Sequence, residues 1–375
     1  MARRQPKQVK PADPLTAFAS IEPGLEEALA DELMDLGLSV TLLEGGVEFP
    51  ATFETLCAVH LWSRLAARVT VRLGRFRTSN LEDLARQVRN IPWNQYVWPH
   101  QKLDVGVSSR SSRLRHQGSI ERKIAFAIGD ALRGPRLPGN RSPREAAKLV
   151  LRIVSNDATL SIDASGELLH RRGWKKATAK APLRENLGAA LLRLAEWEPK
   201  IPLVDPMCGS GTMPIEAACI SLGIAAGAMR SFAYSQWPCF RGLSIPKPSD
   251  RPLDLVAPIV AADRDEGAIK ATRANGQRAR ALSRITVLQS DFAHLEPPAS
   301  RGLVVINPPF GERIGTRPKL IYRHVGQVLR RWSGWRFALL MPSPSLRNAL
   351  GLPNEVLAKF PHGGLKVVAV TGEVP

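Results

Sequence analysis

The chain has 375 residues, more than a single hydrophobic core usually spans, so we expect two or three domains. Its composition is that of a globular protein, with 44% hydrophobic residues, and its net charge is +18. It contains no run of about 18 apolar residues and no apolar signal-peptide core, which excludes a membrane-spanning protein.

The positive charge lies mainly after the first 59 residues. Residues 60–152 hold 19 basic and 6 acidic side chains, whereas residues 1–59 hold 4 basic and 10 acidic ones. A basic segment of this kind favours a phosphate-rich partner such as RNA. General solubility through positive charge is the alternative interpretation.

The cysteines give no sign of a metal site or of a disulfide. Cys57, Cys208, Cys219 and Cys239 form no Cys-x-x-Cys pair and have no histidine at ligand spacing. Buried free thiols are typical of a reducing compartment, so we expect a cytoplasmic protein without a bound metal or a membrane partner. The sequence does not predict an oligomeric state.

Residues 15–79 are predicted to form a ferredoxin-like domain, preceded by a disordered basic tail at residues 1–14. Leu25, Leu29 and Leu33 recur at helical spacing, and Gly37 ends this helix. The expected elements are a strand at residues 16–20, this helix, strands at 40–43 and 46–49, a helix at 53–61 and a strand at 66–73. The order β-α-β-β-α-β is that of a ferredoxin-like unit.

Residues 80–165 are predicted to form a second α+β unit. Its expected elements are a helix after Asn80, a strand at residues 102–108, a helix at 119–132 and paired strands at 149–154 and 159–164. A basic, serine-rich loop lies between the first strand and the second helix. We predict that cations of this loop and helix contact RNA phosphates, namely Arg110, Arg113, Arg115, Arg122 and Lys123. An ordinary solvated face is the alternative for these residues.

A glycine-rich turn follows a short apolar strand that ends at Asp205. Gly209 and Gly211 allow the backbone to turn sharply and approach a ligand, and the helix that begins near Thr212 presents free N–H groups. A dinucleotide site would have a third glycine three residues later and no acid before the turn, so Asp205 is expected to meet a cation. The candidate cofactor-binding residues of this turn are Asp205, Met207, Cys208, Gly209, Ser210, Gly211 and Thr212.

Further candidates follow the next predicted strands. The strand at residues 259–262 ends in Asp263, with Asp265 as an alternative that spacing does not exclude. The strand at 285–288 leads to Asp291 and Phe292, and the strand at 303–306 leads to Asn307. The carboxyl ends of parallel strands form one crevice in a doubly wound sheet, so we expect these residues to line one site. Each aspartate alone is equally consistent with a helix cap.

The tetrapeptide Asn307-Pro308-Pro309-Phe310 suggests a substrate. Its two prolines forbid further strand pairing. An exocyclic amine on a nucleobase is a weak nucleophile, because its lone pair is delocalised into the ring. The Asn307 side-chain oxygen and the Pro308 carbonyl are acceptors that favour a localised lone pair, and Phe310 is able to stack on the base. A Pro-Pro turn after a core strand is the alternative.

This tetrapeptide resembles the catalytic motif of class I S-adenosylmethionine-dependent amino-methyltransferases, and residues 180–375 resemble that class as a whole. Residues 80–165 resemble a THUMP domain, which is an RNA-binding module. The segment Ala-Pro-Leu-Arg-Glu-Asn-Leu-Gly-Ala-Ala-Leu-Leu at residues 181–192 begins a predicted helix with Pro182 at its start. It is similar to a segment of the family that joins THUMP to a guanine-N2 methyltransferase domain, and residues 205–212 are closer to its ribosomal RNA branch.

The resemblance implies an α/β fold, with a Rossmann-like class I methyltransferase domain at residues 166–375 after the ferredoxin-like and THUMP units. It implies S-adenosylmethionine as the cofactor, with Asp205 on its amino group, Asp263 on its ribose and Asp291 on its adenine, which Phe292 covers. The implied reaction is methylation of the N2 amine of a guanine in RNA. Asn307, Pro308, Pro309 and Phe310 are the implied catalytic residues.

Several alternatives remain open at this point. The implied RNA is 23S ribosomal RNA, with transfer RNA as the alternative. The tetrapeptide fits adenine as well as guanine, so the alternatives are an adenine-N6 or protein-glutamine methyltransferase and a non-catalytic RNA-binding assembly factor. Members of the ribosomal branch often carry a second methyltransferase domain, and we expect any such activity to come from another protein.

Overall fold

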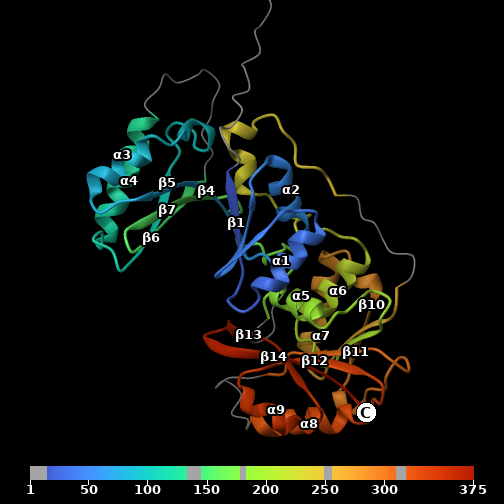
Figure 1. The fold of residues 1–375 in the computed structure, drawn as a ribbon. Helices are drawn as coiled ribbons and strands as arrows, with labels where there is room; N and C mark the ends of the chain where they lie inside the picture. Colours follow the sequence, from blue (N-terminus) through green and yellow to red (C-terminus); the bar gives the residue numbers. More distant parts are fainter. Residues whose placement is uncertain (1–14, 133–144, 178–182, 249–255, 310–317) are drawn as a thin grey trace, which may run out of the picture.

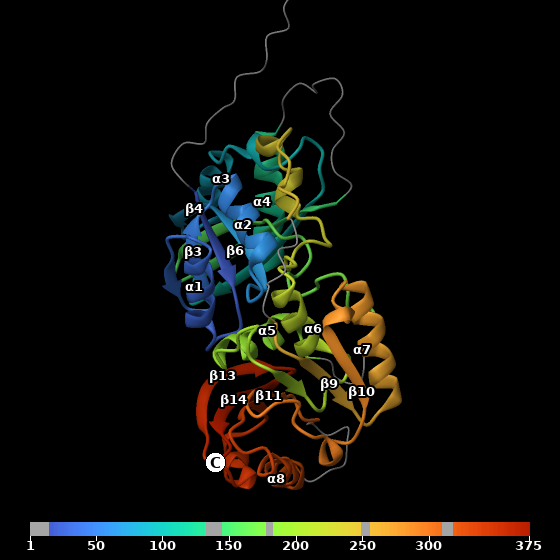
Figure 2. The ribbon, with the colours of Figure 1, turned by 90° about the vertical axis from the view of Figure 1, so that its right-hand side faces the viewer.

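The computed structural model describes residues 15–132, 145–177, 183–248, 256–309 and 318–375. Within these residues the chain forms two seven-stranded sheets, one from each half of the sequence, which lie one above the other (Figures 1 and 2). None of the helices in these ranges is both long and apolar enough to cross a membrane.

The N-terminal sheet has the strand order β2-β3-β1-β4-β7-β6-β5. Its first part consists of β1 (Thr16–Ser20), α1 (Glu26–Asp35), β2 (Thr41–Leu43), β3 (Gly46–Pro50), α2 (Phe53–Trp62) and β4 (Arg68–Arg77). This is the predicted β-α-β-β-α-β order. Alternate strand residues, such as Ala17 and Val71, are buried in the core with Leu29 of α1 and Leu56 of α2.

The second part of this sheet continues from the central strand β4, which pairs with β7. It consists of α3 (Leu81–Arg89), η1 (Trp93–Gln95), β5 (Leu103–Arg110), α4 (Gln117–Ala131), β6 (Ala147–Val154) and β7 (Asp157–Asp163). The strand predicted at residues 66–73 continues to Arg77, because its later residues pair with β7 after a bulge between Arg72 and Gly74. One continuous sheet therefore crosses the predicted boundary between residues 79 and 80.

The C-terminal sheet has the order β10-β9-β8-β11-β12-β14-β13. Its first elements are α5 (Glu185–Leu194), β8 (Leu203–Asp205), α6 (Thr212–Ser221), η2 (Ala233–Gln236), η3 (Pro238–Phe240), β9 (Ile259–Asp263), α7 (Glu266–Arg278), η4 (Leu282–Arg284), β10 (Ile285–Gln289) and η5 (Phe292–His294). The remaining elements are β11 (Leu303–Ile306), α8 (Pro318–Leu329), β12 (Arg336–Met341), η7 (Pro344–Leu346), α9 (Arg347–Leu350), β13 (Glu355–His362) and β14 (Leu365–Glu373).

This order confirms the predicted Rossmann-like sheet. Strands β8 to β12 run parallel, β14 and β13 complete the edge as an antiparallel hairpin, and the strand order reverses between β8 and β11. Alternate residues of β11 face two cores. Leu303 and Val305 belong to the core shared with α5 and α6, whereas Val304 and Ile306 pack with α8. Burial on both faces explains the continuous apolar run of this strand.

The helix α5 begins later than predicted. Its first residue is Glu185, after an extended Arg184, and Pro182 lies outside the described residues. The glycine at position 188 is explained by packing, because a Cβ there would approach the Thr212 Cγ2 to 3.0 Å. Gly188 therefore allows α5 to lie close to the start of α6.

A buried ion-pair cluster joins the two halves of the chain. The Glu216 carboxylate of α6 accepts hydrogen bonds from Arg64 Nη1 at 3.0 Å and from Arg172 Nε at 3.2 Å. Arg64 follows α2, and Arg172 lies in the segment of the chain between β7 and α5. The side chains of Glu216 and Arg172 are almost fully buried, so each charge needs its partner. The N-terminal half is therefore anchored to the helix that follows the glycine-rich turn.

Candidate cofactor and substrate site

Asp205 and Asn307 lie at the same edge of the C-terminal sheet. Asp205 ends β8, Asn307 directly follows β11, and these neighbouring parallel strands pair Leu203 with Leu303 and Val204 with Val304. The carboxyl ends of both strands therefore meet at the point where the strand order reverses. This is where open α/β sheets bind their ligands.

Each of these two residues has a buried oxygen without a hydrogen-bond partner. The Asp205 Oδ1 accepts a hydrogen bond from the Met207 backbone N–H at 3.2 Å, but its Oδ2 has no donor within the described residues. The Asn307 Oδ1 is equally buried and equally without a donor there. Buried polar atoms are nearly always satisfied in folded proteins, so these two acceptors indicate a site that a ligand with donor groups would complete.

Burial raises the pKa of Asp205 well above its usual range, and the nearby charge of Asp263 raises it further. Desolvation disfavours the ionised carboxylate, and no cation among the described residues compensates its charge. A cationic ligand group beside Oδ2 would supply that compensation. The electrostatics of this position therefore agree with the predicted cation.

The glycine-rich turn has the backbone conformation that its glycines predict. Gly209 and Gly211 have φ angles of 55° and 82°, in the left-handed region, and Gly211 is the N-cap residue of α6. The Gly209 N–H donates to the Asp263 Oδ2 at 2.9 Å, and the Cys208 N–H donates to the Ala262 carbonyl at 2.9 Å. The turn is thus held against the end of β9.

Two polar residues of α7 fix this turn from the other side, and sequence reasoning did not find them. The Thr272 hydroxyl donates to the Gly209 carbonyl at 2.9 Å, and the Asn275 side-chain amide donates to the Ser210 carbonyl at 3.0 Å. Both side chains are fully buried. Their only sequence signal is polar character at buried positions of the helix, which cannot be recognised before the packing of the helix is known.

The other side chains of the turn are largely internal. Cys208 is buried, its Sγ lies 3.6 Å from the Thr272 hydroxyl, and burial raises the pKa of its thiol well above its usual value. The Thr212 Oγ1 accepts a hydrogen bond from Lys175 Nζ at 2.8 Å, and Met207 packs partly buried against the core beside α8. A ligand at this turn would therefore meet mainly backbone groups.

The two neighbouring acids after β9 have different environments. Asp263 lies at the strand end and binds the glycine-rich turn, whereas Asp265 is the N-cap of α7 and accepts a hydrogen bond from the Ala268 N–H at 2.7 Å. This geometry favours Asp263 as the ligand-binding acid. Asp265 has the role of helix cap that was the alternative for each aspartate.

Asp291 and Phe292 follow β10 at the same edge. The Asp291 Oδ1 accepts a hydrogen bond from the Ala293 N–H at 2.9 Å and caps the turn η5. The Phe292 side chain is only 2% exposed and lies edge-on to Trp332, with 5.9 Å between ring centroids. Its ring is part of the core, and its role in covering the adenine stays a prediction.

The predicted strand end at the tetrapeptide is present. The strand β11 stops at Ile306, and Asn307, Pro308 and Pro309 have no regular secondary structure. Pro308 is buried and Pro309 is exposed. Phe310 lies outside the described residues, so its stacking role stays a prediction.

The five predicted RNA-binding residues lie in the N-terminal half of the chain, apart from this edge. Arg110 ends β5, Arg113 and Arg115 follow it, and all three are exposed, as is Arg122 on α4. Lys123 is engaged in an ion pair with Glu82 of α3. Lys123 therefore has a structural partner, whereas the four arginines are accessible.

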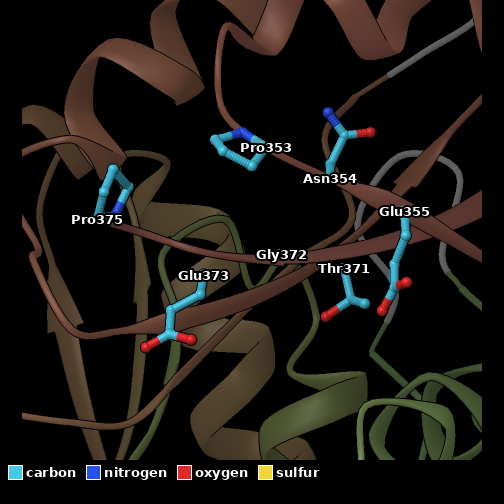
Figure 3. A pocket seen from close by; sticks show the side chains of 7 residues that line it. All are labelled: Pro353, Asn354, Glu355, Thr371, Gly372, Glu373 and Pro375. Atoms are coloured by element: carbon cyan, nitrogen blue, oxygen red, sulfur yellow. The ribbon is translucent and has the colours of Figure 1, made fainter.

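A pocket of about 480 Å³ lies at the opposite edge of the C-terminal sheet (Figure 3). Its lining residues are Pro353, Asn354, Glu355, Thr371, Gly372, Glu373 and Pro375. Glu373 pairs with Arg336, the first residue of β12, so this pocket lies at the amino ends of the parallel strands. It does not include any of the predicted ligand-binding residues.

In the described part of the chain, no three His, Cys, Asp or Glu side chains form a group suited to a metal ion.

We expect Gly211→Ala to destabilise the protein by about 3 kcal/mol and to weaken ligand binding at the turn. The left-handed backbone costs a non-glycine residue about 1–2 kcal/mol, and the new Cβ would lie 2.8 Å from the Thr272 Cγ2. Gly37→Ala is a matched control, because Gly37 has a similar φ of 80° with no atom near its Cβ position. Denaturant unfolding of both variants measures the difference, and equal losses would show that packing at Thr272 is unimportant.

Comparisons with known proteins agree with this architecture. Residues 172–363 match the model of a family described as RMKL-like methyltransferase domain, and residues 16–70 match the ferredoxin-like domain of RlmL. Neither match includes residues 80–165, so their assignment as a THUMP domain stays a prediction.

Individual relatives and a solved structure are similar over most of the chain. A protein of Synechocystis named as a candidate RNA methyltransferase is 35% identical, over 93% of this chain and 94% of its own length. The ribosomal RNA large subunit methyltransferase K/L of Methylococcus capsulatus is 37% identical over 89% of this chain, which spans only 48% of that relative. The crystal structure of a candidate methyltransferase complexed with SAH matches with a TM-score of 0.83 and 26% identity, over 96% of this chain and 98% of that one.

Proposed function

Since this chain belongs to the family with an RMKL-like methyltransferase domain, we propose that it methylates the exocyclic N2 amine of a guanine in the RNA of the large ribosomal subunit. The observation that carries the proposal is the pair of unsatisfied buried acceptors, Asp205 Oδ2 and Asn307 Oδ1, at one edge of neighbouring strands. One acceptor suits the cofactor and the other suits the amine of the substrate.

The cofactor of this family is S-adenosylmethionine, and the residues at the sheet edge fit it. Asp205 would hold its amino group, because the buried carboxylate has no cationic partner among the described residues, and Asp263 and Asp291 would receive its ribose and adenine. The backbone of the glycine-rich turn, held by Asp263, Thr272 and Asn275, would lie against it. When bound, S-adenosylmethionine supplies a methyl group on a positively charged sulfur, which is an activated leaving group.

Asn307 and Pro308 would position the amine. The Asn307 Oδ1 and the Pro308 carbonyl accept its two N–H groups, so that the nitrogen lone pair points away from both and toward the methyl carbon. The main contribution of these residues is alignment, which lowers the barrier without a strong general base. The amine proton becomes acidic as the nitrogen is alkylated and leaves to water. Pro309 and Phe310 complete the proposed catalytic segment, with Phe310 stacked on the base.

The RNA substrate is supported by charge and by the names of the relatives. The segment 60–152 is strongly basic, and Arg110, Arg113, Arg115 and Arg122 of that segment are exposed. The relatives matched by this chain are named for RNA or for ribosomal RNA of the large subunit. The choice of guanine rests on the family resemblance, since an amide and a carbonyl would bind the adenine amine in the same way.

Nucleoside mass spectrometry tests this proposal directly. Ribosomal and transfer RNA are isolated from cells with and without the gene, and N2-methylguanosine is quantified in 23S, 16S and transfer RNA. We expect a loss in 23S RNA that returns with the wild-type gene but not with an Asn307→Ala gene. A loss confined to transfer RNA, or a loss of N6-methyladenosine instead, would contradict the proposed substrate.

A further inference from the structure

We propose that the open face of the N-terminal sheet binds the sugar-phosphate backbone of the RNA, through Arg77, Arg110 and Arg152. This inference rests on the proposed function and deepens it, because it names a binding surface that lies on the strands themselves. Only Arg110 was among the predicted RNA-binding residues. The strand pairing places the other two on the same face as Arg110.

The strand register places these arginines in two adjacent rows on one face. In the first row, Arg110 of β5 pairs with Val154 of β6, Val154 with Asp157 of β7, and Asp157 with Arg77 of β4. The second row consists of Ser108, Arg152, Thr159 and Arg75. Residues paired across strands point to the same side of a sheet. Four arginines and one acid therefore share this part of the face.

The bulge in β4 contributes to this arrangement. Arg72 pairs with Ser161, and after the extra residue Leu73 the register resumes so that Arg75 and Arg77 pair with Thr159 and Asp157. If Leu73 were instead paired regularly, without a bulge, Arg75 and Arg77 would lie three and five positions after Arg72 and would point to the opposite, core side of the sheet. The irregularity thus places three arginines of one strand on the open face.

This face is exposed, whereas the other face is covered by helices. Residues of β6 alternate strictly between buried and exposed, and those of β5 alternate between half-buried and exposed. The exposed set contains Arg110 and Arg152, and Val150 and Val154 are 42% and 37% exposed. The helices α3 and α4 pack on the buried side through Leu84, Ile120 and Ile124.

The three arginines have no carboxylate partner within the part of the chain that the structure describes. Three other arginines of this face are already paired, Arg68 with Asp163 and both Arg72 and Arg75 with Glu48. Arg77, Arg110 and Arg152 form no such ion pair among the described residues. They occupy three of four neighbouring strands, which places the outer two about 14 Å apart at the usual strand spacing. Such a spacing suits successive charges of one nucleic-acid strand.

The side chains between these arginines indicate contact with the backbone of RNA rather than with its bases. Sheet surfaces that read single-stranded bases present aromatic rings for stacking. The two rows contain valine, serine, threonine and aspartate beside the arginines, and no aromatic residue. Arginine recognises phosphate through paired N–H donors. We therefore infer binding that depends on charge and not on sequence.

The open face is also turned toward the methyltransferase domain. In both views β6 lies between the helices α3 and α4 on one side and the hairpin of β13 and β14 on the other (Figures 1 and 2). The helices α3 and α4 cover the far side, so the open face lies on the side of the sheet toward the methyltransferase domain.

The test is binding of a fluorescein-labelled 20-nucleotide RNA of mixed sequence, measured by anisotropy between 50 and 300 mM salt. We expect the triple variant Arg77→Gln, Arg110→Gln, Arg152→Gln to raise the Kd about 10- to 100-fold. A plot of the logarithm of the association constant against the logarithm of the salt concentration has a negative slope. The magnitude of this slope should decrease by about 2, because each lost phosphate contact removes about 0.7 for single strands. The single variant Arg152→Gln should lower the slope by about 0.7.

The matched control removes three exposed arginines at the amino edge of the C-terminal sheet, by Arg280→Gln, Arg284→Gln and Arg301→Gln. It changes the net charge equally, so an equal loss of affinity in both triple variants would overturn the proposed face. An unchanged Kd and slope in the first variant would overturn it as well. The two proposals can also fail separately. If the wild type binds RNA and only the first variant loses that binding, the face is supported. If the wild type and the first variant both fail to methylate RNA, the proposed reaction is not supported.

Discussion

Asn307→Ala is expected to lower kcat for RNA methylation about 10²- to 10³-fold, the cost of removing one positioned polar group at a reacting atom. The Kd for S-adenosylmethionine should change by less than about threefold, because the contacts assigned to the cofactor belong to Asp205, Asp263 and the glycine-rich turn. Single-turnover methylation and calorimetric cofactor binding measure the two quantities separately. The stability should not fall, since the Asn307 Oδ1 has no donor within the described chain.

Asn307→Asp is the matched variant, because it keeps an acceptor oxygen and nearly the same shape. We expect it to retain about tenfold more activity than the alanine variant, since a carboxylate oxygen still accepts a hydrogen bond from the amine. Equal and parallel losses of cofactor affinity and activity in both variants would mean that Asn307 shapes the cofactor site. The proposed role in holding the substrate amine would then be wrong.

The strand ends of the methyltransferase domain could be predicted because their signals are local. A short β-branched run that ends at Asn-Pro-Pro must be a buried strand that stops there, and Gly209 and Gly211 mark a turn whatever surrounds them. Once these strands are assumed to lie parallel, their carboxyl ends must meet. The observed pairing of β8 with β11 and with β9 follows that reasoning.

The arrangement of the N-terminal half could not be predicted in the same way. Arg77 joins β4 only because Asp157, 80 residues later, offers it a pairing partner, and no pattern within residues 66–79 encodes that contact. Position in sequence grouped Arg110 with Arg122, whereas the fold puts the first on a strand and the second on a helix of the covered side. Basic residues are easy to find in a sequence, but the face that they share depends on long-range register.

Residues that support the glycine-rich turn are also invisible without the packing. Thr272 and Asn275 lie one turn apart on α7 and resemble ordinary polar helix positions. Their donors become meaningful only when the helix is placed against the carbonyls of Gly209 and Ser210. The burial of Phe292 likewise depends on Trp332, which follows α8 and lies 40 residues later in the chain.

Asp205→Asn is expected to weaken binding of S-adenosylmethionine by about 10²-fold or more, because separating a buried charge pair costs about 2–5 kcal/mol. In the absence of cofactor, the same variant should raise the free energy of unfolding by about 1–3 kcal/mol. This corresponds to a rise in Tm of about 2–4 °C for each kcal/mol. The reason is that the wild-type carboxylate is fully buried, so its ionised form is disfavoured by desolvation, whereas the asparagine amide carries no charge. Asp157→Asn, at an exposed strand position, is the control and should change neither quantity.

The pH dependence of this effect has a definite sign. Because the pKa of Asp205 is raised in the folded state, the folded protein binds a proton more tightly than the unfolded chain does. The stability of the cofactor-free wild type should therefore fall, relative to Asp205→Asn, as pH rises from about 4 through the raised pKa. Cofactor affinity should rise over the same range, since only the ionised carboxylate attracts the amino group. Thermal unfolding and calorimetric cofactor binding at several pH values check both trends. If the stability of the wild type instead rose with pH relative to the variant, an internal partner would already stabilise the charge of Asp205.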